Sequence, residues 1–262
     1  MKNLISLLIV VFSIGLARAD IREFDQATIE KLGVAIYEQD IRAATATDML
    51  FAKVTNPVAA GLRGWIVEGD AKSMLVRFIR QTDNGFEAYY DVLFKGKNKP
   101  VLQVPKDRKL TSVQLAQYKA RTLALKNIKR PVSKNYNCVI LPDPEKDGFL
   151  VYALAATTNP YDVMVGGHYR FTISKDGEKL LQSDELFKTL IVMSKKPKEL
   201  PPGATLTALT MSTLVSDMPL ETHVYLSLLH KMPFYVATPN NEKTPLWKVE
   251  NGKIEKVDMP PS

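Results

Sequence analysis

The 262-residue chain has 35 lysines and arginines against 28 aspartates and glutamates, a formal net charge of +7, and 45% of its residues are apolar. This composition excludes a disordered chain and is sufficient for a sizeable core. The single cysteine, Cys138, excludes an intrachain disulfide framework. We expect Cys138, within "NYNCVILP", to be a buried strand residue, and a nucleophile or an intermolecular disulfide is the alternative.

The amino terminus has the pattern of a secretory signal peptide. Lys2 provides a charged start, residues 4–16 form an apolar run, and Ala17-Arg18-Ala19 is a small-x-small cleavage site. The run is shorter than the about 20 apolar residues that span a membrane, and no later stretch reaches that length. Removal of residues 1–19 would lower the net charge to +5, because Lys2 and Arg18 leave with them. An uncleaved anchor or a lipoprotein is the alternative, although no cysteine lies near the cleavage site.

A first amphipathic helix is predicted from Asp25 or Thr28, either of which can cap it, to about Phe51. Its Asp40 and Asp48 lie nearly in line on one side of the helix. Eight helical residues span about 12 Å, which is too far for two carboxylates to flank one bond. We therefore favour a structural polar seam, with a solvated face and a catalytic pair as the alternatives.

Three strands are predicted next, at Gly64 to Gly69, Ser73 to Arg80 and Phe86 to Phe94, with the turn signal "TDNG" joining the last two into a hairpin. Alternation in the third strand predicts a single buried face made of Phe86, Ala88, Tyr90, Val92 and Phe94. A second amphipathic helix is predicted from about Ser112 to Asn127, because Thr111 and Gln114 form a capping-box pattern.

The remainder is rich in predicted strands. Residues 148–157 are apolar on both faces, as in a central strand, and residues 166–174 turn at Lys175-Asp176-Gly177 toward another strand. Residues 222–230, "THVYLSLLH", are predicted to form a hairpin with residues 234–238. A last hairpin is predicted at Asn251-Gly252.

The order of these elements predicts an α+β fold of predominantly antiparallel sheets, with two amphipathic helices and a β-rich C-terminal half. The basic, proline-containing stretch from Lys129 to Asn137 is a candidate boundary. It would separate a helix-sheet-helix half, residues 20–130, from a β-rich half, residues 131–262. One continuous domain is equally compatible with the length.

No nucleotide-binding, zinc-protease or serine-hydrolase motif is present, so catalytic residues are unknown and no cofactor or metal is expected. Alternation places His168 and Arg170 on one strand face, and His223 and Tyr225 on one face of another predicted strand. If these strands are neighbours, the four residues form a cluster able to bind an anionic or aromatic ligand. The alternative is an ordinary solvated sheet face.

These features favour a periplasmic or secreted binding or interaction protein of unknown ligand, with a cell-envelope hydrolase that has a non-standard site as the alternative. Lysines concentrate at 95–100, 126–134 and 195–203, and we interpret these segments as solvated loops. An anionic ligand or an acidic envelope component such as lipid head groups remains a candidate partner. Nucleic acid is not expected, because the signal peptide takes the chain away from it.

Overall fold

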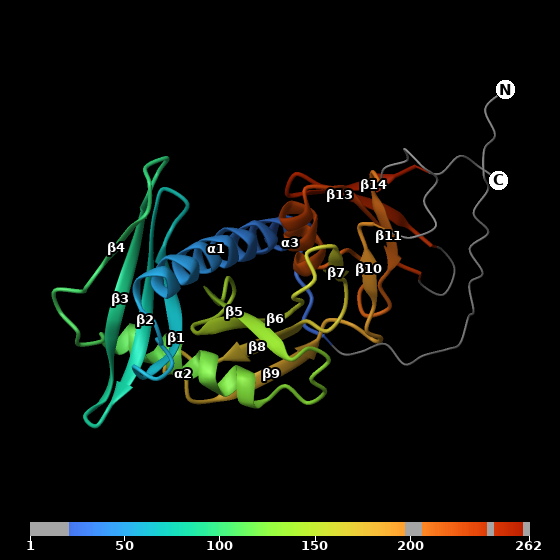
Figure 1. Cartoon of the computed structure of the whole chain (residues 1–262). Helices are drawn as coiled ribbons and strands as arrows, with labels where there is room; N and C mark the ends of the chain where they lie inside the picture. Colours follow the sequence, from blue (N-terminus) through green and yellow to red (C-terminus); the bar gives the residue numbers. More distant parts are fainter. Residues whose placement is uncertain (1–20, 197–205, 240–243, 259–262) are drawn as a thin grey trace.

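The computed structural model describes residues 21–196, 206–239 and 244–258, and the predicted signal peptide lies outside them. The described residues form three helices and fourteen strands, and nearly all strand pairs are antiparallel, which confirms the predicted α+β class. Figure 1 shows the long helix α1 (Gln26–Lys53) extending from the C-terminal sheet at one end of the molecule to the N-terminal sheet at the other. Among these residues, no helix combines the length and apolarity needed to cross a bilayer.

Helix α1 begins as predicted, because the Asp25 carboxylate accepts a hydrogen bond of 2.7 Å from the Thr28 backbone N–H. The helix crosses the buried helix α3 (Glu221–His230) at Gly33. A Cβ atom at Gly33 would lie 2.4 Å from Cβ of Val224 and 2.8 Å from the carbonyl oxygen of Glu221. The missing side chain therefore allows the two helix backbones to approach closely.

The N-terminal sheet contains β1 (Leu62–Gly69), β2 (Ser73–Thr82), β3 (Gly85–Lys95) and β4 (Val101–Gln103), antiparallel in chain order. One face packs on the C-terminal half of α1, where Val76, Phe78 and Val92 are fully buried. On the opposite face, Ile66 and Ile79 pack beneath α2 (Ser112–Lys126). The sheet therefore lies between the two helices, but α2 covers only part of its face.

The prediction of a single buried face on β3 is wrong. A bulge interrupts the pairing of β2 with β3 between Arg77 and Ile79, and one extra residue reverses the side to which every later side chain points. Ala88 pairs with Ile79, which packs on the α2 side, whereas Val92 packs on the α1 side.

The central sheet has the order β5 (Asn135–Pro142), β6 (Phe149–Ala156), β8 (Tyr169–Ile173) and β9 (Leu180–Glu185). β6 is buried at every position except its last, as predicted for a central strand, and Cys138 is buried on β5. α2 has the predicted capping box of Thr111 and Gln114 and packs on this sheet as well. β7 (Asp162–Met164) and β10 (Val192–Ser194) form a separate antiparallel pair.

The C-terminal sheet has β11 (Leu209–Ser212) parallel to β12 (Phe234–Ala237), followed by the antiparallel strands β13 (Leu246–Glu250) and β14 (Lys253–Val257). The hairpin predicted at Asn251-Gly252 is confirmed. The predicted strand at 222–230 is wrong, because these residues form α3, a third helix. Every residue from Glu221 to Ser227 is buried, and a helix surrounded on all sides shows no amphipathic period in its sequence.

Core packing continues across residue 130. Ile66 and Ile79 share a cluster with Phe149 and Phe171 of the central sheet, and Ile36 of α1 shares another with Leu150. These shared clusters join the two predicted halves, residues 20–130 and 131–262, and their division into separate domains stays a prediction.

We expect Gly33→Ala to lower the free energy of unfolding by about 1–3 kcal/mol, because the new methyl group overpacks the crossing with α3. We expect this loss although alanine, at an open helix position, stabilises the helix by about 1 kcal/mol relative to glycine. Ala44→Gly, at an exposed position of α1, measures that propensity alone. Urea denaturation of both variants tests this, and a Gly33→Ala protein more stable than the parent would contradict it.

Candidate functional site

The predicted cluster of His168, Arg170, His223 and Tyr225 does not lie on an open sheet face. All four side chains are buried, with 1–4% of their surface exposed. Arg170 lies on β8, a strand buried on both faces, and His168 is the residue just before that strand. His223 and Tyr225 belong to α3. The open-face geometry is wrong because residues 222–230 form a helix and both faces of β8 are covered.

Arg170 is instead the centre of a buried ionic network. Its Nε and Nη2 donate to Oδ2 of Asp184 at 2.9 and 2.7 Å, and its Nη1 donates to Oε1 of Glu221 at 2.5 Å. Nη2 also donates to the backbone carbonyl of Arg22, and the Tyr152 hydroxyl donates to Oε1 of Glu221 at 3.0 Å. Burial alone would lower the pKa of Arg170, but the charges of Glu221 and Asp184 raise it above its usual value. The network is structural, since solvent does not reach it.

Replacing Arg170 with methionine is expected to lower the free energy of unfolding by about 3–5 kcal/mol, because Asp184 and Glu221 would remain buried without their cation. Arg130→Met is the matched control, since Arg130 pairs with Glu185 at the surface and its loss should cost less than about 1 kcal/mol. Chemical denaturation measures both values, and similar small losses in the two variants would contradict the structural role of Arg170.

The two buried histidines have internal partners. Nε2 of His168 lies 2.7 Å from the Met164 carbonyl oxygen, and its Nδ1 accepts a hydrogen bond of 3.0 Å from the Ala155 N–H. Nδ1 of His223 accepts a hydrogen bond of 2.9 Å from the N–H of Leu220, the N-cap of α3. Burial lowers the pKa of His168 to about 4 and that of His223 to about 3, where the nearby His168 contributes further. Both imidazoles are therefore neutral near pH 7.

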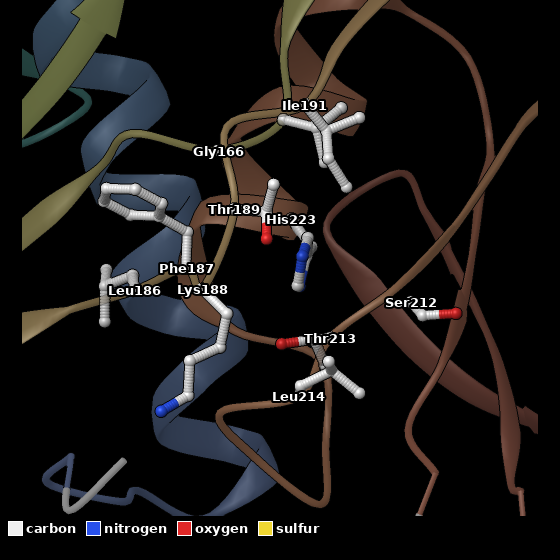
Figure 2. A pocket seen from close by; sticks show the side chains of 11 residues that line it. Gly166, Leu186, Phe187, Lys188, Thr189, Ile191, Ser212, Thr213, Leu214 and His223 are labelled. Carbon is white, nitrogen blue, oxygen red and sulfur yellow. The ribbon is translucent and has the colours of Figure 1, made fainter. Parts of the chain in front are cut away.

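His223 also lines a small cavity of about 70 Å³, enclosed by segments 165–166, 186–191 and 212–214. Figure 2 shows its imidazole among the side chains of Thr189, Ile191 and Thr213. The volume holds about two water molecules, each of which occupies about 30 Å³ in the liquid. No carboxylate is among the lining residues, so the cavity lacks the group that would orient the imidazole as a general base.

His223→Gln is expected to weaken the pH dependence of stability. The unfolded histidine takes up a proton near its ordinary pKa of 6.5, whereas the folded one does so near 3, so stability is lost as pH falls from about 6.5 toward 3. Glutamine at this third helical position can still accept from the Leu220 N–H, which retains the cap. Unfolding measured between pH 4.5 and 6.5 should show a slope smaller by up to about 1.4 kcal/mol per pH unit. An unchanged slope would show that His223 does not titrate in this way.

Asp40 and Asp48 have separate roles. The Tyr225 hydroxyl donates to Oδ2 of Asp40 at 2.8 Å, and Nδ2 of Asn137 donates to Oδ1 at 3.0 Å. Burial raises the pKa of Asp40, although these two hydrogen bonds oppose that effect. Asp48 is exposed. The structural polar seam is thus confirmed for Asp40, while Asp48 is solvated.

The described part of the chain also contains a larger cleft that the sequence did not indicate, with a volume of about 390 Å³. It lies on the face of the N-terminal sheet opposite α1, beyond the part covered by α2. Arg77, Asp91 and Gln103 are paired across β2, β3 and β4, so their side chains lie side by side on this face. The other lining residues come from the segment between β4 and α2: Val104, Lys106, Asp107, Lys109 and Thr111.

Arg77 is held in position within this cleft. Its Nε and Nη2 donate to the two carboxylate oxygens of Asp91 at 2.8 and 2.7 Å, and its Nη1 donates to Oε1 of Gln114 at 3.1 Å. Gln114 is itself fixed, because it completes the capping box with Thr111 and donates to Glu68 at 2.7 Å. The hydrogen bond with Asp91 raises the pKa of Arg77. A guanidinium has five N–H groups, so two remain without a partner among the described residues.

The sequence signal for this site was incomplete. Near the turn of the β2–β3 hairpin, Thr82 pairs with Gly85 and Ile79 pairs with Ala88. If this register continued, Tyr90 would lie opposite Arg77. The bulge shifts the register by one residue and brings Asp91 there instead. Nothing in the local sequence indicates this shift.

Comparisons with known proteins give no relative. No family model matches the chain, no curated protein matches it, and no solved structure matches its fold. Within residues 21–196, 206–239 and 244–258, no group of three or more histidine, cysteine, aspartate or glutamate residues is arranged to hold a metal ion.

Proposed function

We propose that this chain is a secreted or periplasmic binding protein that takes a small anionic ligand in the cleft at Arg77. The observation that carries the proposal is the fixed guanidinium of Arg77, which has two N–H groups to spare and lines a cleft of about 390 Å³. Pockets for small ligands have volumes of about 300–1,000 Å³, and the cavity at His223 is several times smaller.

The charges around the cleft favour an anion. Among the lining residues, Arg77, Lys106 and Lys109 contribute three positive charges and Asp91 and Asp107 two negative ones. Glu68 does not line the cleft, but its carboxylate also acts on Arg77 and accepts a hydrogen bond from Gln114. Both carboxylate oxygens of Asp91 already accept from Arg77, and Asp107 accepts from the backbone N–H of Lys109. The unused groups are mainly donors, which suit a carboxylate or phosphate group.

The N-cap of α2 adds to this preference. Thr111, which caps that helix, lines the cleft, so the positive end of the helix dipole lies at its edge.

A cell-envelope hydrolase is the alternative, but neither buried histidine is placed to act as its general base. His168 uses both ring nitrogens in backbone hydrogen bonds, and the cavity at His223 has no carboxylate in its lining. A general base needs an imidazole that can reach a substrate proton and a group that orients it.

Isothermal titration with succinate, citrate and glycerol phosphate, and with the neutral analogue succinamide, tests the proposal. We expect at least one of the three anions to bind and succinamide not to bind. Lys106→Ala/Lys109→Ala should weaken binding at least about tenfold, because two charge-assisted contacts are lost. Lys175→Ala/Lys179→Ala removes the same charge from an exposed turn of the central sheet and should bind like the parent.

Three results would each contradict the proposal. They are equal binding of succinamide, unchanged affinity of the Lys106→Ala/Lys109→Ala protein, and no binding of any of the three anions at millimolar concentration.

A further inference from the structure

Residues 95–109 form one of the strongly basic segments of the chain. Residues 95–109 contain five lysines and Arg108 against a single acidic residue, Asp107, which gives a net charge of +5. This equals the net charge of the whole chain after removal of the predicted signal peptide, so the rest of that chain is neutral overall. A second basic segment, residues 119–134, has six lysines and arginines and no acidic residue, but its Lys119 and Arg130 are paired with Glu178 and Glu185.

This segment forms the outer edge of the N-terminal sheet. Val101 pairs with Leu93, and further along the Ala88 N–H donates to the Arg108 carbonyl at 2.8 Å, so residues 101–108 follow the free side of β3. Figure 1 shows β4 and its flanking loops at the end of the molecule away from the C-terminal sheet. The segment's lysines are all exposed, and none forms an ion pair within the described residues: Lys95, Lys97, Lys99, Lys106 and Lys109.

Two apolar side chains lie among these cations. Val101 is 55% exposed and Val104 is 50% exposed. An acidic polymer offers charge but nothing for the valines to contact. A bilayer of anionic phospholipid offers phosphate groups at its surface and an apolar layer directly below them, which matches lysines surrounding exposed valines.

We propose that the basic edge, residues 95–109, docks on the surface of a bilayer that contains anionic phospholipid. Docking does not require the cleft to bind its ligand. It implies, however, that the cleft opens close to the membrane surface, because Lys106 and Lys109 belong to both sites.

Sedimentation of the purified protein with vesicles tests the docking. The vesicles are phosphatidylcholine alone or phosphatidylcholine with about a third phosphatidylglycerol. We expect binding to the anionic vesicles only, and a decrease in binding as salt is raised. Lys95→Ala/Lys97→Ala/Lys99→Ala should weaken it at least about tenfold. The control Lys31→Ala/Lys175→Ala/Lys179→Ala removes three exposed lysines elsewhere and should bind like the parent.

The valines separate a bilayer from a soluble polyanion. Val101→Thr/Val104→Thr keeps the side-chain shape and should weaken binding to anionic vesicles several-fold, while leaving binding to polyglutamate unchanged. Because Lys95, Lys97 and Lys99 do not line the cleft, their triple variant should bind small anions like the parent, so docking and ligand binding can fail separately.

Four results would overturn the docking proposal. Equal binding to neutral vesicles would exclude a role for charge, and an equal loss in the control triple variant would show that net charge alone acts. Unchanged vesicle binding after the valine substitutions would point to an acidic polymer surface. If the edge-lysine variant binds vesicles normally but self-associates in ultracentrifugation, the lysines serve only to protect the sheet edge from pairing with other strands.

Discussion

The buried guanidinium of Arg170 is the interaction on which the rest of this structure depends. It contacts the backbone of the N-terminal segment at Arg22, the carboxylate of Asp184 on β9 and the carboxylate of Glu221 at the start of α3. A buried charge is tolerated only when its partners are in place, so these three segments must assemble together. Helix α3 in turn positions two neighbouring elements. α1 crosses α3 at Gly33, and the Ser227 hydroxyl of α3 donates to the Val249 carbonyl of β13.

A second strand arginine, Arg77, is held in a similar way but with a different result. Arg170 makes four hydrogen bonds with its five N–H groups and is almost completely buried. Arg77 makes three and lines a cleft that α2 leaves uncovered. The contacts that orient Arg77 are internal, and its side chain lines the cleft. This is the preorganised arrangement that lets a binding site meet a ligand with little reordering.

Local signals in the sequence were sufficient for much of the fold. The Asp25 cap, the Thr111 capping box, the buried strand β6 and the turn at Asn251-Gly252 each depend on residues close together in the chain. The sequence of α3 predicts a strand because the helix is buried on all sides and its apolar residues therefore show no helical period.

The sites depended on distant contacts that one sequence does not reveal. The partners of Asp40 are 97 and 185 residues away, and the pairing of Arg77 with Asp91 depends on a bulge. The open sheet face predicted for His168, Arg170, His223 and Tyr225 was wrong for the same reason, since it assumed that α3 was a strand beside β8.

The most direct test of a binding site at Arg77 is ¹⁵N NMR of the arginine side chains during titration with the tightest-binding anion. The Nε resonance of Arg77 should shift with ligand concentration and saturate, while that of Arg170 should stay constant because no solvent reaches it. A titration that saturates with no change at Arg77, or with changes centred on the residues around His223, would contradict the assignment.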